Sequence, residues 1–211
     1  MTKNKFILII FIAFYLPGLA QSKVDTSKFV VNDTSYFIIT HDQEEYKASI
    51  QIYVKKDNDW DLFQQIDTID FNFVIEGPKF SDLNNDGKQD FKIYYSSGAR
   101  GANELYHVFL WNKEFNNYSF FEPASGIPNF GLNNKGVLEG VFFTGSTTYI
   151  QYKIDEDSLV AISKQRTYPN EKNRYTIIEY YLKNELGKME FHSKDSVNEL
   201  SPMPLIPELK E

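Results

Sequence analysis

The sequence predicts an all-β protein, an antiparallel meander with a small β-propeller-like arrangement or, alternatively, a β-sandwich. Short runs of apolar and polar residues alternate with a period of two, as they do in half-buried strands. The 14 tyrosines and 18 phenylalanines supply the aromatic side chains that strands favour. No stretch keeps apolar residues at the 3.6-residue spacing over three turns between helix-capping signals, so we place no long helix.

The expected strands follow one another at short intervals, with turn residues between them. Segments 56–59 and 112–117, rich in Asp and Asn, join neighbouring runs in the manner of hairpins. The sequence shows no clean internal repeat, which argues against a regular many-bladed array. In chain order the predicted strands are 35–40, 48–55, 60–66, 71–76, 91–96, 106–111, 118–121, 137–143, 147–154, 159–165, 174–182 and 188–192.

The first 20 residues have the pattern of a secretory signal peptide. Lys3 and Lys5 precede an apolar run over 6–16, and Gly18-Leu19-Ala20 supplies small residues for cleavage. A membrane anchor is the alternative, but this run is shorter than the roughly 20 residues that span a bilayer. We therefore expect a periplasmic or secreted protein that has no membrane insertion after the signal is removed.

The expected organisation is a signal peptide (1–20), a single β-rich calcium-loop domain (21–200) and an extended proline-rich tail (201–211). The chain has no cysteine, so a secreted form must rely on its core, optionally with a metal. Cleavage deletes two lysines and no acidic residue, which takes the formal net charge from −7 to −9. An acidic chain disfavours nucleic acid as a partner and suits a basic protein.

Residues 82–90 have the ligand spacing of a calcium loop. Counted from the first aspartate, oxygen-bearing side chains occupy positions 1, 3, 5 and 9, glycine occupies position 6, and position 7 can offer its backbone carbonyl. Calcium prefers six to eight oxygen ligands, and the glycine permits the sharp turn around the ion. The predicted metal ligands are Asp82, Asn84, Asp86, Lys88 through its carbonyl, and Asp90.

This loop differs from an EF-hand, because its twelfth position is the apolar Ile93. The alternative interpretation is a solvated Asn/Asp/Gly turn without metal. A cation would explain how the sequence tolerates three nearby carboxylates, and its role would be structural, since no open coordination position is evident.

A second loop, 96–106, is rich in small residues and lies between two patterned strands. Loops on a rigid scaffold often carry binding function, glycine allows close approach, and an arginine can pair with a carboxylate. A flexible connector is the alternative. The candidate partner-binding residues are Ser97, Gly98, Arg100, Gly101, Asn103 and Tyr106.

Catalytic signatures are weak. Cysteine nucleophiles are absent, and His41, His107 and His192 are widely separated without metal-ligand spacing. His107 is the best single candidate for chemistry, although a hydrogen-bonded strand histidine is the simpler interpretation. We therefore expect a protein that is not an enzyme.

Segment 80–91 resembles the calcium loop of integrin-type β-propeller repeats (FG-GAP or VCBS-like). It is similar to a family of bacterial secreted propeller-like proteins that inhibit lysozyme-type peptidoglycan hydrolases as immunity proteins. Besides segment 80–91, this similarity includes Ser96, Ser97, Gly98, Gly101, Asn103, Tyr106 and the strand over 108–111. The resemblance covers about residues 70–125. It implies that loops beside the calcium site enter the hydrolase cleft, with Tyr106 or the 97–103 loop as the matching region.

The leading hypothesis is a calcium-stabilised secreted or periplasmic binding protein that inhibits a lysozyme-like hydrolase. A calcium-dependent surface adhesion or glycan-binding module is the alternative from another class, and a hydrolase comes third. The resemblance implies Ca²⁺ as cofactor and a peptidoglycan hydrolase as partner, while the sequence leaves the oligomeric state open.

Overall fold

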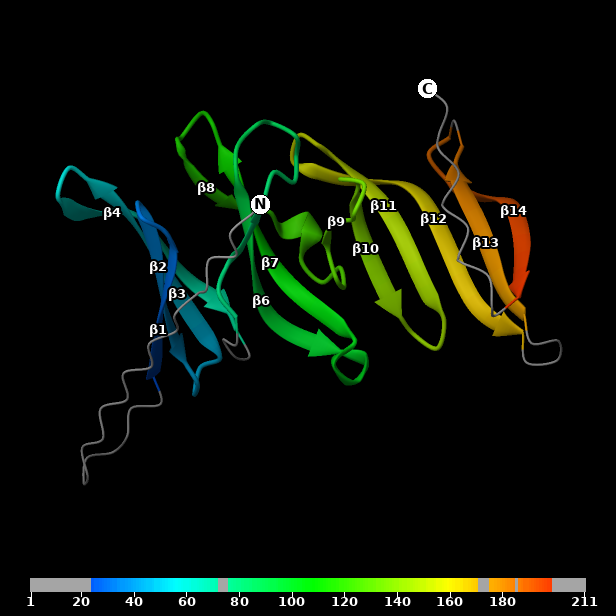
Figure 1. The fold of residues 1–211 in the computed structure, drawn as a ribbon, viewed down its shortest axis with the longest axis horizontal. Helices are drawn as coiled ribbons and strands as arrows, with labels where there is room; N and C mark the ends of the chain where they lie inside the picture. The colour runs from blue at the N-terminus through cyan, green and yellow to red at the C-terminus, as the bar shows by residue number, and fades with distance from the viewer. Residues whose placement is uncertain (1–23, 72–75, 171–174, 185, 199–211) are drawn as a thin grey trace, which may run out of the picture.

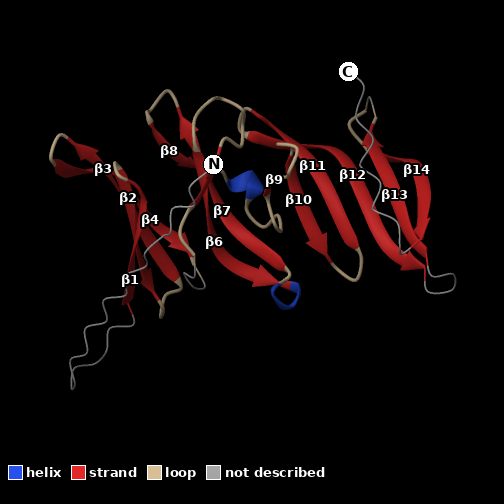
Figure 2. Cartoon of the chain, viewed as in Figure 1, coloured by secondary structure: helices blue, strands red, loops and turns tan. Residues whose placement is uncertain are grey.

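A computed structural model of the chain describes residues 24–71, 76–170, 175–184 and 186–198. These residues form three antiparallel sheets in which sequential strands are neighbours, which confirms the all-β meander. The helices in this part of the chain are two single 3₁₀ turns, η1 (Ala99–Gly101) and η2 (Glu122–Ala124) (Figure 2). None of the described residues belongs to a helix long and apolar enough to cross a bilayer.

The first sheet is a four-stranded meander whose central strands alternate between buried and more exposed residues. In β2 and β3 the buried positions recur every second residue, which places Phe37, Ile39, Ile50 and Ile52 on one face. The strands are β1 (Val24–Asn32), β2 (Ser35–Asp42), β3 (Lys47–Lys56) and β4 (Asp59–Asp70).

The second sheet occupies the middle of the molecule (Figure 1). Its strand β7 has four consecutive buried residues, from Tyr106 to Phe109, so this strand is covered on both faces. The strands are β5 (Lys79–Ser81), β6 (Asp90–Gly98), β7 (Asn103–Asn112) and β8 (Asn117–Phe120).

The third sheet contains the six remaining strands and forms the C-terminal end of the array (Figure 1). Its long outer strands are more exposed than those of the middle sheet, although Ile178 and Tyr180 of β13 are buried. The strands are β9 (Gly131–Leu132), β10 (Leu138–Phe143), β11 (Thr147–Asp155), β12 (Ser158–Asn170), β13 (Tyr175–Lys183) and β14 (Met189–Asn198).

Two hydrophobic cores hold the sheets together, one on each face of the middle sheet. The first joins Phe91, Ile93 and Phe109 of the middle sheet to apolar residues of β2 and β3. The second joins Tyr106 and Val108 to the η2 region and to β10–β12. The alternation predicted for β6 is confirmed, because Tyr95 packs on the first core and Tyr94 on the second. The three sheets thus stack face to face, with the middle sheet between the other two.

Several strand predictions need correction. The strand expected over 71–76 does not form at its ends, because Phe71 and Glu76 lie outside the strands, and its centre lies outside the described residues. Three strands were not predicted: β1 has a mostly exposed pattern, while β5 and β9 have three and two residues, too short for periodicity to register. The predicted signal peptide and proline-rich tail also lie outside the described residues.

Phe91 is the aromatic hub of the first core. Its ring is fully buried, stacks on Phe109 at 4.6 Å and meets Phe37 and Tyr118 edge-on at 5.1 and 4.7 Å between centroids. We predict that Phe91→Ala lowers the free energy of unfolding by about 3–5 kcal/mol, through lost burial and the cavity left behind.

Urea unfolding followed by circular dichroism measures this loss. The matched control is Phe115→Ala, because the Phe115 side chain is 68% exposed and should change stability by less than about 0.5 kcal/mol. Equal effects of the two substitutions would contradict the proposed core.

Candidate functional site

The oxygen-rich loop connects β5 to β6 and is closed by its own side chains. Asp82 accepts hydrogen bonds from the backbone N–H groups of Asp86 at 3.0 Å and Gly87 at 2.9 Å, and Asn84 accepts one from Asp86 at 3.1 Å. Gly87 has φ +80°, a left-handed conformation that glycine adopts without steric cost. The chain therefore makes the tight turn that the spacing predicted.

Asp90 anchors this loop to the middle sheet. Its carboxylate is fully buried and accepts from the backbone N–H of Leu83 at 2.7 Å and of Trp111 at 2.8 Å. Burial raises the pKa of Asp90, while the two backbone hydrogen bonds act in the opposite direction and favour the carboxylate. The ligand spacing predicts Asp90 as a metal ligand alone and does not indicate this link between the loop and β7.

The donor set of the loop fits a hard cation. Asp82, Asn84 and Asp86 are all oxygen donors, and the charges of Asp82 and Asp86 are close enough to disfavour ionisation of Asp90. Lys113 partly offsets this charge, with Nζ 3.0 Å from the Asp86 carbonyl and 3.5 Å from its carboxylate. Among the described residues, however, no three Asp, Glu, His or Cys side chains gather in a metal-binding group. Calcium binding therefore stays a prediction.

The second predicted site forms the tip of the β6–β7 hairpin. Ala99, Arg100 and Gly101 all have positive φ, at 48°, 57° and 91°. Such conformations cost energy for residues with a side chain and often occur at functional sites. Ser97, Arg100 and Gly101 are exposed, Gly98 is half-buried, and Arg100 makes no hydrogen bond or ion pair with another described residue.

Two asparagines clamp the base of this hairpin against the third sheet. Asn103 is buried; its side chain donates to the Phe143 carbonyl at 3.2 Å and accepts from the Phe143 N–H at 2.9 Å. Asn129 donates to the carbonyls of Ala102 and Val141 and accepts from the Glu104 N–H. Asn103 thus supports the loop from inside the protein. No motif or spacing in the sequence predicts that Asn129 does the same.

Tyr106 does not lie on the surface where sequence analysis placed it. It is 3% exposed and belongs to the second core. Its hydroxyl donates to the Glu104 carboxylate and accepts from Lys79 Nζ at 3.1 Å. Burial, together with the Glu104 hydrogen bond, raises the pKa of Tyr106 to about 12. Period-two alternation places Tyr106 on one face of β7. It cannot show that the third sheet covers this face, in addition to the first sheet covering the other.

The two predicted sites lie at opposite ends of β6 (Figure 1). The oxygen-rich loop precedes Asp90, and the hairpin tip follows Gly98. Nine residues of extended strand separate them by about 25–30 Å. The expectation that the partner loop lies beside the metal site is therefore wrong in space, although the two loops are close in sequence.

Two of the three histidines, His41 and His107, are packed inside the protein and contact backbone carbonyls. His41 and His107 lie on different sheets, and their Nε2 atoms contact the consecutive carbonyls of Phe71 and Asp70. The His107 ring also stacks on Tyr95 with centroids 4.0 Å apart. Nδ1 of His107 is buried without a hydrogen-bond partner in the described part of the chain. This arrangement supports the interpretation of His107 as a packed strand histidine.

Comparison with known proteins bears on the fold. No protein-family model and no curated protein matches the sequence. Among solved structures, a Xanthomonas protein described as Type IV secretion system related superposes with a TM-score of 0.54 at 13% identity, over 83% of this chain and 96% of that one. At this identity the similarity establishes a shared fold.

Burial lowers the pKa of His107, although the Asp70 carbonyl and charge act in the opposite direction. The folded protein therefore favours neutral His107, and the unfolded chain binds its proton more readily. We predict that stability present above about pH 6.5 declines as the pH falls below this value, and that His107→Gln, which keeps a donor for Asp70, reduces this decline.

Midpoints of urea unfolding measured from about pH 7.5 to about pH 5.5 test whether the stability falls with the pH. The exposed His192, changed to Gln, controls for loss of a histidine. A wild-type protein that becomes more stable over the same acidification would refute the assignment.

Proposed function

We propose that this protein is a secreted or periplasmic calcium-stabilised binding protein that inhibits a lysozyme-like peptidoglycan hydrolase. The observation that carries the proposal is the tip of the β6–β7 hairpin, where Arg100 is exposed and pairs with no other described residue, on a backbone clamped by Asn103 and Asn129. A loop ordered before binding loses less conformational entropy on association.

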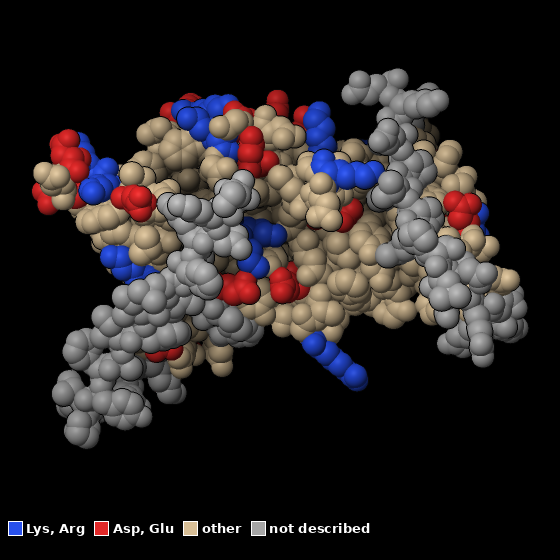
Figure 3. Space-filling model, in the orientation of Figure 1, with Lys and Arg blue, Asp and Glu red and all other residues tan. Residues whose placement is uncertain are grey.

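The chemistry of Arg100 suits the active site of such an enzyme. Glycoside hydrolases generally use a pair of Asp or Glu carboxyl groups beside the scissile bond. The planar guanidinium group can bind a carboxylate through two parallel hydrogen bonds. A basic side chain extends away from the body at the edge where the β6–β7 hairpin turns (Figure 3). Inhibition would combine steric occlusion with this charge pairing.

The partner loop in this proposal consists of Ser97, Gly98, Arg100 and Gly101. Asn103 and Tyr106 are reassigned to support, since both are buried. The acidic charge of the chain would steer it towards a basic hydrolase. The secretion-related description of the Xanthomonas structure is compatible with a secreted or periplasmic binding role.

A calcium-dependent glycan-binding or adhesion module is the second candidate, and the outer sheet favours it. On one face of β12–β14, Tyr168 and Tyr181 both donate to Glu179, and Lys194 approaches the same carboxylate at 3.4 Å. Arg166 lies 5.3 Å from the Tyr168 ring centroid. Aromatic rings beside cations form a surface that can contact sugars. In this cluster the tyrosine hydroxyls and Lys194 already bond to Glu179, which leaves the rings themselves as the contact surface.

Calcium should stabilise the protein through the 82–90 loop. With an affinity near the 10⁻⁴ to 10⁻³ M range of extracellular modules, calcium at about one hundred times its dissociation constant adds about 2.7 kcal/mol. We predict a rise in melting temperature of roughly 5–10 °C relative to chelator, and loss of this increment in Asp86→Ala.

Differential scanning calorimetry with calcium or EDTA measures the increment. Asp157→Ala is the matched control, because Asp157 is an exposed aspartate in the β11–β12 turn. An equal calcium-dependent rise in melting temperature in wild type and Asp86→Ala would show that the 82–90 loop does not bind calcium.

Charge reversal at the hairpin tip tests the inhibitor proposal. We predict that Arg100→Glu weakens inhibition of the target hydrolase by roughly 30-fold or more, because central arginine anchors often contribute about 2 kcal/mol or more to binding. The assay follows clearing of a peptidoglycan suspension by goose-, chicken- and chitinase-like lysozymes and by any hydrolase encoded beside this protein.

Arg166→Glu provides the control, since it reverses an exposed arginine on the third sheet. Asn103→Ala should weaken inhibition less than Arg100→Glu while loosening the loop. If no hydrolase is slowed at micromolar protein, or if replacing 97–102 with glycine and serine leaves inhibition intact, the proposed partner site is wrong.

A further inference from the structure

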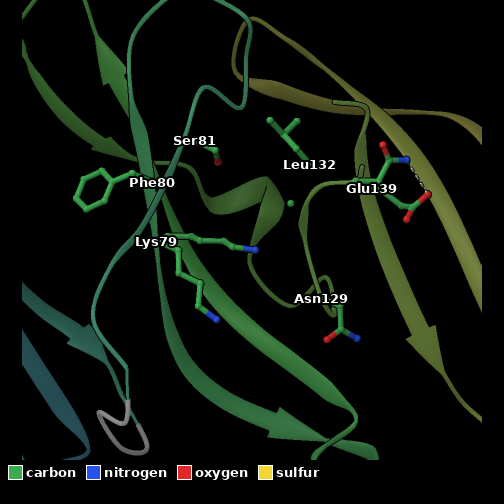
Figure 4. A pocket seen from close by; sticks show the side chains of 9 residues that line it. Lys79, Phe80, Ser81, Asn129, Leu132 and Glu139 are labelled. Carbon is green, nitrogen blue, oxygen red and sulfur yellow. Dashed lines mark hydrogen bonds between the residues drawn. The ribbon is translucent and has the colours of Figure 1, made fainter. Parts of the chain in front are cut away.

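A pocket of about 240 Å³ opens between the middle and third sheets. Lys79, Phe80 and Ser81 of β5 and Lys92 of β6 line one side, while segment 129–133 and Glu139 of β10 line the other. Lys79 and Glu139 lie on opposite sides of this space (Figure 4). The pocket is separate from both predicted loops and plays no part in the proposed inhibition.

Two lysines lie directly opposite each other at this pocket. Lys79 and Lys92 are cross-strand partners in the β5–β6 ladder, a position where like charges destabilise a sheet. Lys79 is compensated, since its Nζ lies 2.6 Å from the Glu76 carboxylate and 3.1 Å from the Tyr106 hydroxyl. The sheet therefore keeps a like-charge pair of which one member is already neutralised.

Lys92 is the cation that lacks a counter-charge in direct contact. Its Nζ donates to the Phe130 carbonyl and lies 4.1 Å from the Tyr106 ring centroid. Within the described part of the chain it forms no ion pair with a carboxylate. An ammonium group has three donors, so one bond to Phe130 leaves hydrogen-bonding capacity for a ligand.

The remaining walls define the size and polarity of that ligand. Leu132 supplies apolar surface, while the Phe80 ring points away from the pocket (Figure 4) and packs in the first core, so Phe80 borders the pocket through its backbone. Glu139 accepts from Asn133 at 3.4 Å, and burial raises its pKa while this hydrogen bond acts in the opposite direction. The volume equals about eight molecules of liquid water. These walls suit a short ligand with one negative charge and a small apolar part.

We propose that this pocket binds a small organic monocarboxylate, with its carboxylate between the Nζ atoms of Lys79 and Lys92 and its apolar part against Leu132. A phosphate dianion fits less well, because a single uncompensated cation cannot balance it and Glu139 forms part of the wall. The charge-assisted hydrogen bonds to Lys92 provide most of the selectivity.

Titration of the ¹⁵N-labelled mature protein with D-lactate at pH 7, followed by amide chemical shifts, tests this assignment. We expect saturable shifts centred on residues 79–81, 92 and 129–133. D-lactamide, the neutral analogue, should produce none, and phosphate should bind more weakly than lactate. Lys92→Met should weaken lactate binding by about tenfold or more, and Lys79→Met should weaken it less.

Lys153→Met is the matched control, because Lys153 is 69% exposed and does not line the pocket; it should bind lactate as wild type does. Four results would overturn the proposal: equal shifts with lactamide, tighter phosphate binding at these residues, non-saturating shifts spread over surface lysines, or unchanged affinity in both pocket variants. If Lys92→Met does not fold, Lys79→Met decides the question alone, because that side chain is 45% exposed.

Discussion

The structure depends on a middle sheet that is buried on both faces. Four successive residues of β7, from Tyr106 to Phe109, alternate between the two cores, so each core uses every second side chain of the same strand. A sheet in this position can have no solvent face, and each polar group on it needs a partner inside the protein. The first and third sheets each bury an apolar face against it. Both candidate loops lie at the ends of β6, so their positions are fixed by the packing of this sheet between the other two.

The buried polar residues of the middle sheet show how this requirement is met. Asp90 accepts from two backbone amides, Asn103 pairs with both backbone groups of Phe143, and Lys92 donates to the Phe130 carbonyl. These bonds join the sheet to its connecting loops and to the third sheet. Leaving such a group without its partner costs about 1–3 kcal/mol, so each bond also selects a single arrangement of sheets and loops. Nδ1 of His107 and Oδ1 of Asn117 in β8 are exceptions among the described residues of this sheet, since both atoms are buried without a hydrogen-bond partner.

The sequence predicts strands well where one face is exposed to solvent. It predicts them poorly where the packing of other sheets determines which residues are buried. Alternation identified β2, β3 and β6, including the opposite faces of Tyr94 and Tyr95. It could not distinguish a strand with one covered face from one with two, which is why Tyr106 was expected at the surface. The sequence also contains no sign of the asparagine clamp, since the Asn103 side chain bonds to the backbone of Phe143, which is 40 residues away. The ligand spacing located the oxygen-rich loop. It could not show that the Asp90 carboxylate accepts hydrogen bonds from two backbone amides, which compete with a metal ion for its oxygens.

The separation of the two loops restricts how a metal could influence a partner. The oxygen-rich loop and the hairpin tip stand at opposite ends of β6, so an ion at one end does not touch the candidate partner-binding residues at the other. Any coupling must pass through the sheet, where Asp90 ties the loop to Trp111 of β7 and the same strand begins at Asn103, the residue that clamps the tip. A cation would then act on binding by stabilising β6 and β7 as a unit. Its removal should lower the stability of the scaffold before it alters the chemistry of Arg100.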